Sequence, residues 1–244
     1  MTFTKKVSRR LDKKKEQLLW KYRELEYRSY ADPRSLHWDW TTTSYNRLSL
    51  VNSLVHLRGG GSCDYLEIGC FQDTLFNAVF ACNKVGVDPQ QGGTLRLTSD
   101  EFFRDNQEAF DVIFIDGLHE YEQVRKDAVN ALQCLKPGGF IAFHDMLPRH
   151  WKEQHVPRLN EEWTGDVWKL AFELAESPDL DFRIVSIDYG VGVLRVNSPS
   201  PQLVDRQSEL TSATFGYFYE NHHKLPLLSW EEFTKWADLC GEPS

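Results

Sequence analysis

Residues 110–143 read FDVIFIDGLHEYEQVRKDAVNALQCLKPGGFIAF, and this stretch decides the fold class. It begins with a continuous apolar segment, Phe110–Ile115, which is typical of a strand buried on both faces. A helical pattern follows, because apolar residues recur at spacings of three and four over residues 121–135. The turn PGG at 137–139 leads into a second apolar segment, Phe140–Phe143. A strand, a helix and a strand in this order predict a right-handed unit of a parallel sheet.

The same alternation extends to both sides of this stretch. Further strands are expected at Asp64–Ile68, Lys84–Val87, Thr94–Thr98, Phe182–Ile187 and Val191–Val196. Helices are expected at Thr74–Cys82, from about Asp100, and at Gly165–Glu176. The last two strands are separated only by Asp188-Tyr189-Gly190, which predicts a closing antiparallel hairpin. The sequence therefore predicts an α/β protein with a Rossmann-like, doubly wound, seven-stranded and mostly parallel sheet.

The two ends of the chain do not follow this alternation. We expect an N-terminal helical extension at 1–60, the Rossmann-like domain at 61–200 and a C-terminal extension packed on the core at 201–244. Residues 5–30 predict one charged helix with a narrow apolar stripe formed by Leu11, Leu18, Tyr22 and Leu25. The stripe must cover either the protein's own core or a second copy of the helix, so a homodimer is one expectation.

Charge and composition exclude several classes of function. The 244 residues carry a net charge of −8, of which the first 30 residues contribute +6 and the rest −14. An acidic body argues against a nucleic-acid enzyme, whose working face should be basic. No apolar run approaches the length of a membrane span, and the odd number of cysteines, without a CxxC spacing, suits a reducing compartment. We expect a cytoplasmic protein with a small-molecule substrate and no nucleic-acid or membrane partner.

Polar or acidic residues stand at the carboxyl ends of five predicted strands. They are Glu67 with Gly69, Asp88, Ser99 with Asp100, Asp116, and His144 with Asp145. Ligands of open parallel sheets bind at this edge, so these residues predict a site there. Glu67 and Asp88 are 21 residues apart, as in nucleotide-binding folds. A nicotinamide fingerprint would need glycine where Phe71 and Thr74 stand, which favours an adenosyl cofactor instead.

Four segments together resemble the class I S-adenosylmethionine-dependent methyltransferases, in the branch that includes metal-dependent O-methyltransferases of sugars and natural products. The segments are YLEIGC at 65–70, VD at 87–88, FIDGLHEY at 114–121 and LKPGGFIAFHD at 135–145. The resemblance covers about residues 61–197. It implies S-adenosylmethionine as cofactor, possible Mg²⁺ or Mn²⁺ as a second cofactor, and O-methylation of a small hydroxylated acceptor.

The resemblance also implies roles for single residues. Glu67 and Gly69 would hold the methionine part of the cofactor, Asp88 the ribose, and Ser99 and Asp100 would border the adenine. Asp116 would line the cofactor site as well and, with His144 and Asp145, occupies the positions of a divalent metal. His119, His144 and Asp116 are the candidate catalytic residues, with His119 as a candidate base because an imidazole titrates near neutral pH.

Two departures from the family pattern and two rival functions remain open. Phe71 adds bulk to the cofactor turn, and Asp73 stands where a glycine is usual. We expect Asp73 to cap the helix that starts at Thr74. The loop Met146–Thr164 is rich in aromatic and basic residues and predicts a lid and acceptor wall. The rivals are a metal-dependent hydrolase that uses the same acidic and histidine cluster, and a non-catalytic binding protein that keeps the fold.

Overall fold

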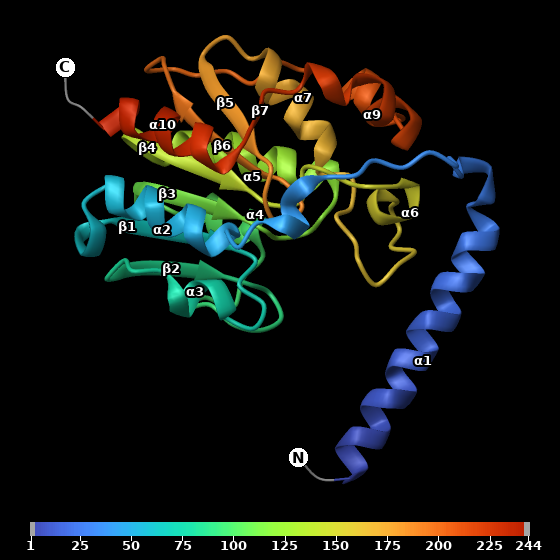
Figure 1. Cartoon of the computed structure of the whole chain (residues 1–244). Helices are drawn as coiled ribbons and strands as arrows, with labels where there is room; N and C mark the ends of the chain where they lie inside the picture. The colour runs from blue at the N-terminus through green and yellow to red at the C-terminus, as the bar shows by residue number, and fades with distance from the viewer. Residues whose placement is uncertain (1–2, 242–244) are drawn as a thin grey trace.

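The computed structural model describes residues 3–241 and is built around one seven-stranded sheet (Figure 1). The strand order is β2-β1-β3-β4-β6-β5-β7. The strands are β1 Asp64–Ile68, β2 Asn83–Val87, β3 Phe110–Ile115, β4 Leu135–Phe143, β5 Leu180–Val185, β6 Val191–Val196 and β7 Leu227–Leu228. All neighbouring strands run parallel except β6, which is antiparallel to both β4 and β5. This arrangement confirms the predicted fold class, including the closing hairpin.

Helices cover both faces of the sheet. The α-helices are α1 Phe3–Glu26, α2 Arg47–Leu57, α3 Thr74–Ala78, α4 Ser99–Asp105, α5 Tyr121–Gln133, α6 Trp151–Gln154, α7 Trp168–Glu176, α8 Gln207–Leu210, α9 Phe215–Asn221 and α10 Trp230–Gly241. Short 3₁₀ turns are η1 Arg28–Tyr30, η2 Asp39–Thr42, η3 Gly60–Ser62 and η4 His222–Lys224.

Each face of the sheet has its own hydrophobic core. Alternate residues of a strand point to opposite faces, so β3 sends Ile113 and Ile115 to one core and Val112 and Phe114 to the other. The first core includes residues of α4, α5, α7 and α9, and the second includes residues of α2, α3 and α10. Because both faces are covered, ligands can reach the central strands only at their ends.

The strand predicted at Thr94–Thr98 is wrong. In this segment only Leu95 makes a β-bridge, with Val87. The hydroxyl of Thr98 accepts a hydrogen bond from the Glu101 amide, and the Glu101 carboxylate accepts one from the Thr98 amide. This capping box commits the end of the segment to the start of α4. Within the described residues, the seventh strand is instead β7, which comes from the C-terminal part of the chain.

The helix predicted over Thr74–Cys82 is shorter than expected and ends at Ala78. The side chain of Asn52 explains the early end, because it donates a hydrogen bond to the carbonyl of Ala78 and accepts one from the amide of Phe80. These bonds hold the chain in an extended conformation from Val79 onward. Asn52 belongs to α2, so the stop signal lies outside the local sequence.

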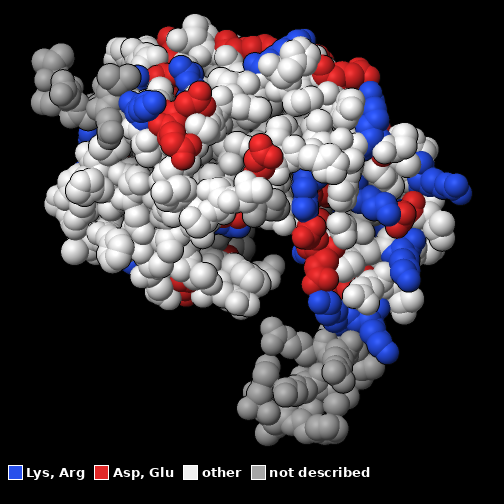
Figure 2. Space-filling view, viewed as in Figure 1, with Lys and Arg blue, Asp and Glu red and all other residues white. Residues whose placement is uncertain are grey.

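Helix α1 extends away from the sheet as a long arm (Figure 1). Its polar groups contact the loop that follows α6: Lys13 pairs with Glu161, and the Arg23 guanidinium donates to the Arg158 carbonyl. The stripe residues Leu18, Tyr22 and Leu25 are 67%, 67% and 71% exposed. The side chain of Leu11, the fourth stripe residue, lies outside the described ones. Figure 2 shows Lys and Arg side chains gathered along the described part of the arm.

Two further findings concern the helices. Ser229 and Glu232 exchange the two hydrogen bonds of a capping box at the start of α10. In the part of the chain that the structure describes, no helix is both long enough and apolar enough to span a membrane.

Candidate active site at the carboxyl edge of the sheet

Asp116, His144 and Asp145 meet where β3 and β4 end. Asp116 directly follows β3, and His144 and Asp145 directly follow β4, its neighbour in the sheet. Strand alternation alone would send His144 and Asp145 to opposite faces. Asp145, however, has a left-handed backbone with φ of 64°. The chain therefore turns at this residue, and both side chains face Asp116.

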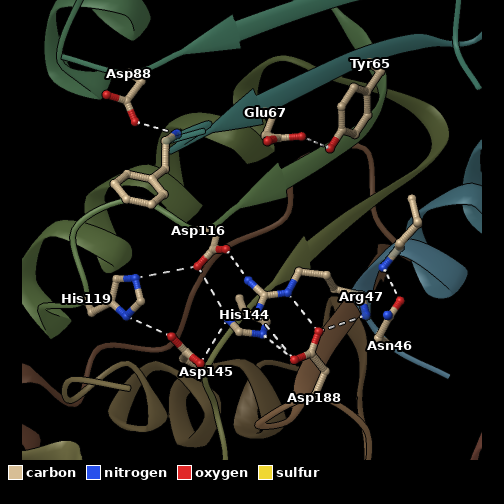
Figure 3. Close-up of polar contacts among 12 residues, drawn as sticks. Asn46, Arg47, Tyr65, Glu67, Asp88, Asp116, His119, His144, Asp145 and Asp188 are labelled. Carbon is tan, nitrogen blue, oxygen red and sulfur yellow. Dashed lines mark hydrogen bonds and ion pairs between the residues drawn. The ribbon is translucent and has the colours of Figure 1, made fainter. Parts of the chain in front are cut away.

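The three residues form one network with His119, which Figure 3 shows. His144 Nδ1 lies 2.9 Å from Asp145 Oδ1 and 3.4 Å from Asp116 Oδ1. His119 Nδ1 lies 2.8 Å from Asp145 Oδ2, and its Nε2 lies 3.6 Å from Asp116 Oδ1. The structure thus brings together the predicted catalytic and metal residues.

Arg47 and Asp188 also belong to this network, and the sequence analysis missed both. Arg47 Nη1 donates to Asp116 Oδ2 at 2.7 Å, and its Nε donates to Asp188 Oδ2 at 2.8 Å (Figure 3). Asp188 Oδ1 lies 3.7 Å from His144 Nε2. Arg47 comes from the first turn of α2, and Asp188 from the turn between β5 and β6. The acidic residue in that turn was a possible signal, but we interpreted it only as a turn former.

The acidic and basic groups of this network stabilise each other's charged forms. Burial alone would raise the pKa of Asp116, yet His144, Arg47 and His119 outweigh burial and lower it. Burial is likewise outweighed at Asp145, whose pKa is lowered by His144 and His119. In return, the two carboxylates raise the pKa of His119 and of His144 against the effect of burial. A cation at this site would replace the imidazolium charge of His144, because only a neutral imidazole can ligate a metal.

Asp116, His144 and Asp145 fit a divalent cation. One ligand atom from each lies within 4.8 Å of the others. His144 is only 4% exposed, so its ring is shielded from water. Neither of its buried ring nitrogens makes a hydrogen bond of good geometry. In octahedral coordination, two ligand atoms that bind the same Mg²⁺ or Mn²⁺ ion at right angles to each other lie about 3.0 Å apart. The His144 contacts to the two carboxylates, at 2.9 and 3.4 Å, are close to that spacing.

Two cavities flank the cluster and share one wall. The first, of about 470 Å³, is lined by Asp88, Ser99, Asp100, Gln123 and His119, among others. The second, of about 440 Å³, is lined by Arg47, Glu67, Gln72 and Asp188, among others. Both cavities are lined by Gly69, Phe71 and Asp116. An elongated ligand could therefore place one half in each cavity, with its middle beside Gly69, Phe71 and Asp116.

Asp88 is held rigidly at the rim of the first cavity. Its Oδ2 accepts from the Phe71 amide at 2.9 Å, and its Oδ1 accepts from the Gln90 and Gln91 amides at 2.8 Å each. The side chain is 8% exposed. A carboxylate has about four acceptor positions, and the three amides use three of them, so about one remains for a ligand.

Glu67 is the buried acid of the second cavity. It is 2% exposed, and its Oε2 accepts a hydrogen bond from the Tyr65 hydroxyl at 2.6 Å (Figure 3). Burial raises the pKa of Glu67 to about 7, although the Tyr65 bond opposes the rise. A buried carboxyl with so little compensation is suited to receive a cationic group of a ligand.

The expected capping role of Asp73 is wrong. Asp73 stands at the position before α3, but its side chain makes no hydrogen bond to that helix. Its Oδ1 accepts instead from the Gly93 amide at 2.6 Å. Asp73 therefore fastens the turn after β1 to the loop after β2.

Trp163, in the predicted lid, packs on the cluster. Its ring is stacked on His119 at 5.2 Å between centroids, with 9° between the planes. The Trp163 Nε1 donates to the His155 carbonyl at 2.8 Å, which fixes the indole. Arg149, a basic residue of the same loop, pairs with Glu153 and Glu162 within it.

Two sequence comparisons each match part of the chain. Residues 81–146 match the model of a family described as a methyltransferase domain. A curated relative, an uncharacterized protein from Acanthamoeba polyphaga mimivirus, is 35% identical over 51 residues. That alignment covers only 21% of this chain and 23% of the relative.

The structural comparison finds methyltransferases at low identity and with TM-scores below 0.5. The O-methyltransferase from Bacillus cereus, in complex with S-adenosylhomocysteine, is 14% identical with a TM-score of 0.44, covering 75% of this chain and 89% of that one. The MycE methyltransferase of the mycinamycin pathway, in complex with Mg and S-adenosylhomocysteine, is 16% identical with a TM-score of 0.39, covering 62% and 49%. The match over residues 81–146 agrees with the methyltransferase resemblance seen in the sequence.

Proposed function

We propose that this protein is an S-adenosylmethionine-dependent O-methyltransferase that acts on a small hydroxylated acceptor. One observation carries the proposal: two cavities of similar size meet at Gly69, Phe71 and Asp116, directly beside the acidic and histidine cluster. A methyl donor with one half in each cavity would have its reactive centre beside these three residues. It would then lie close to groups that can bind a metal and a hydroxyl.

The proposed cofactor contacts follow from the lining of the cavities. Ser99 and Asp100 border the first cavity and are both held by Gln123 Nε2, at 3.1 and 2.9 Å, so they suit the adenine end. Asp88 would accept hydrogen bonds from the ribose hydroxyls. Glu67 lies in the second cavity together with the Gly69 turn, where the ammonium of the methionine part would compensate its buried charge.

Asp116, His144 and Asp145 would hold a divalent cation, Mg²⁺ or Mn²⁺, in this proposal. Such a cation would lower the pKa of an acceptor hydroxyl and fix its orientation for in-line transfer. His119 lies between Asp116 and Asp145, and its ring is fixed by the stacked Trp163. It would orient the two carboxylates, and it is the candidate base.

Ligand binding separates this proposal from its two rivals. Isothermal titration calorimetry with S-adenosylmethionine and S-adenosylhomocysteine, each with and without Mn²⁺, is the experiment. We expect both ligands to bind. If neither adenosyl ligand bound, the proposal would fail. A metal-dependent hydrolase would then still bind Mn²⁺, whereas a non-catalytic binding protein that keeps the fold would bind neither.

The affinity for S-adenosylhomocysteine should fall as the pH drops below 7. The pKa of Glu67 is raised to about 7, and an ammonium group binds only its ionised form. Below that pKa, binding must first remove the proton, which costs up to about tenfold in affinity per pH unit. Calorimetry at pH 6 and pH 8 measures the difference. Glu67→Gln should bind more weakly at pH 8 and lose most of the pH dependence; an unchanged dependence in this variant would remove Glu67 from the site.

We also propose that α1 forms a homodimer contact. The support is its exposed stripe, Leu18, Tyr22 and Leu25, which remains uncovered although polar groups of the same helix dock on the loop after α6. Deleting residues 1–30 should convert a dimer to a monomer in light scattering. Leu18→Glu with Leu25→Glu tests the stripe alone, with Lys14→Glu as a charge control. An assembly state that the deletion leaves unchanged would contradict the dimer. A cytoplasmic location stays a prediction.

A further inference from the structure

Phe71 combines a strained backbone with an exposed aromatic ring. Its φ is 47°, in the left-handed region, and its side chain is 61% exposed. Bulky residues rarely adopt this conformation, which glycine adopts without cost. Strain of this kind is typical of residues that bind or switch.

The surrounding structure maintains this conformation. The buried Asp88 accepts a hydrogen bond from the Phe71 amide at 2.9 Å. The next loop packs against the Phe71 carbonyl: a Cβ atom on Gly92 would lie 2.3 Å from that oxygen, so only glycine fits there. Asp73 then ties the same turn to Gly93. These contacts hold the backbone in place while the ring stays free of the core.

The position of Phe71 matches one part of the proposed donor. Phe71 lines both cavities, together with Gly69 and Asp116. In S-adenosylmethionine, the atom that joins the adenosyl half to the methionine half is the sulfonium sulfur. A donor with one half in each cavity therefore has its positive charge at the wall that Phe71 helps to form. The demethylated product has the same two halves but a neutral sulfur.

We propose that the Phe71 ring recognises the positive charge of the sulfonium through a cation–π contact and so discriminates the methyl donor from its neutral product. The proposal rests on the proposed function, since it assumes the adenosyl cofactor. Aromatic rings attract cationic ligands through the negative face of the ring, and they give no such attraction to a neutral thioether. Release of the product after methyl transfer would be favoured for the same reason.

The test is the ratio of two dissociation constants, for S-adenosylhomocysteine over S-adenosylmethionine, measured by calorimetry on the full chain. Phe71→Leu keeps an apolar side chain of similar size but removes the ring. We expect this variant to lower the ratio by about three- to tenfold, mainly through weaker binding of the charged ligand. Phe71→Tyr keeps the ring and should retain the ratio of the unchanged protein.

The ratio responds to the ligand charge, whereas a structural defect in the turn would weaken both ligands alike. A ratio that Phe71→Leu leaves unchanged would overturn the role of Phe71, while binding of both ligands by the unchanged protein would still support the proposed function. Failure of the unchanged protein to bind either ligand would contradict both. Thermal unfolding of each variant verifies that the turn has not collapsed the domain.

Discussion

Asp145→Asn is expected to reduce the affinity for Mn²⁺ by at least about 100-fold, while S-adenosylhomocysteine still binds nearly as well as before. The reason is that Asp145 is one of three converging ligands, whereas the proposed adenine, ribose and methionine contacts lie on other strands. Asparagine tolerates the left-handed backbone that Asp145 adopts, so the substitution changes the charge and not the turn. Electron paramagnetic resonance of free Mn²⁺ and calorimetry measure the two affinities.

Asp188→Asn is the matched control for this prediction. Asp188 also has a positive φ, of 43°, and it also pairs with His144 and Arg47. It is not one of the three converging ligands, so we expect a loss of Mn²⁺ affinity of only about tenfold, the lower end of the range for residues that orient a ligand. Equal losses in the two variants would show that the cluster acts only through its total charge. Retention of Mn²⁺ binding in Asp145→Asn would contradict the proposed metal site.

Asp88→Ala is expected to weaken the binding of S-adenosylhomocysteine by about 1.5–3 kcal/mol, the contribution of hydrogen bonds to a charged group. This corresponds to roughly 10- to 150-fold in the dissociation constant. The variant also loses the acceptor of three backbone amides, those of Phe71, Gln90 and Gln91. We therefore expect a lower melting temperature as well, and calorimetry must be done below it.

Asp100→Ala separates the two effects of the Asp88 substitution. Asp100 lines the same cavity, but its carboxylate is 55% exposed and accepts from the Gln123 side chain instead of a backbone amide. We expect a smaller loss of affinity and little change in melting temperature. If folded Asp88→Ala bound the ligand as tightly as the unchanged protein, Asp88 would have no place in the cofactor site.

Much of the fold could be predicted because its signals are local. The apolar segments of β1 and β3 and the spacing in α5 follow directly from burial on one or both faces. Segment 94–98 could not be predicted in this way. Its alternating residues suit a strand, but the capping box between Thr98 and Glu101 determines its end. Likewise, α3 ends through Asn52, which is distant in the sequence.

The site could be predicted only in part. Asp116 and Asp145 could be predicted as site residues because parallel strands bring their carboxyl ends to one edge of the sheet. The convergence of His144 was not derivable from alternation, since it depends on the backbone turn at Asp145. Arg47 and Asp188 come from segments about 140 residues apart, in a helix start and a hairpin turn. No local pattern marks such a pair, and only the folded chain brings it to Asp116.

A crystal structure of the protein grown with S-adenosylhomocysteine and Mn²⁺ tests the proposed cofactor and metal sites most directly. We expect an anomalous peak between Asp116, His144 and Asp145. We also expect the adenosyl half of the ligand in the cavity of Ser99 and Asp100, and the homocysteine half beside Glu67. Well-ordered ligand without an anomalous peak would leave a metal-free transferase with a histidine as base. A structure in which neither cavity holds the ligand would contradict the proposed function itself.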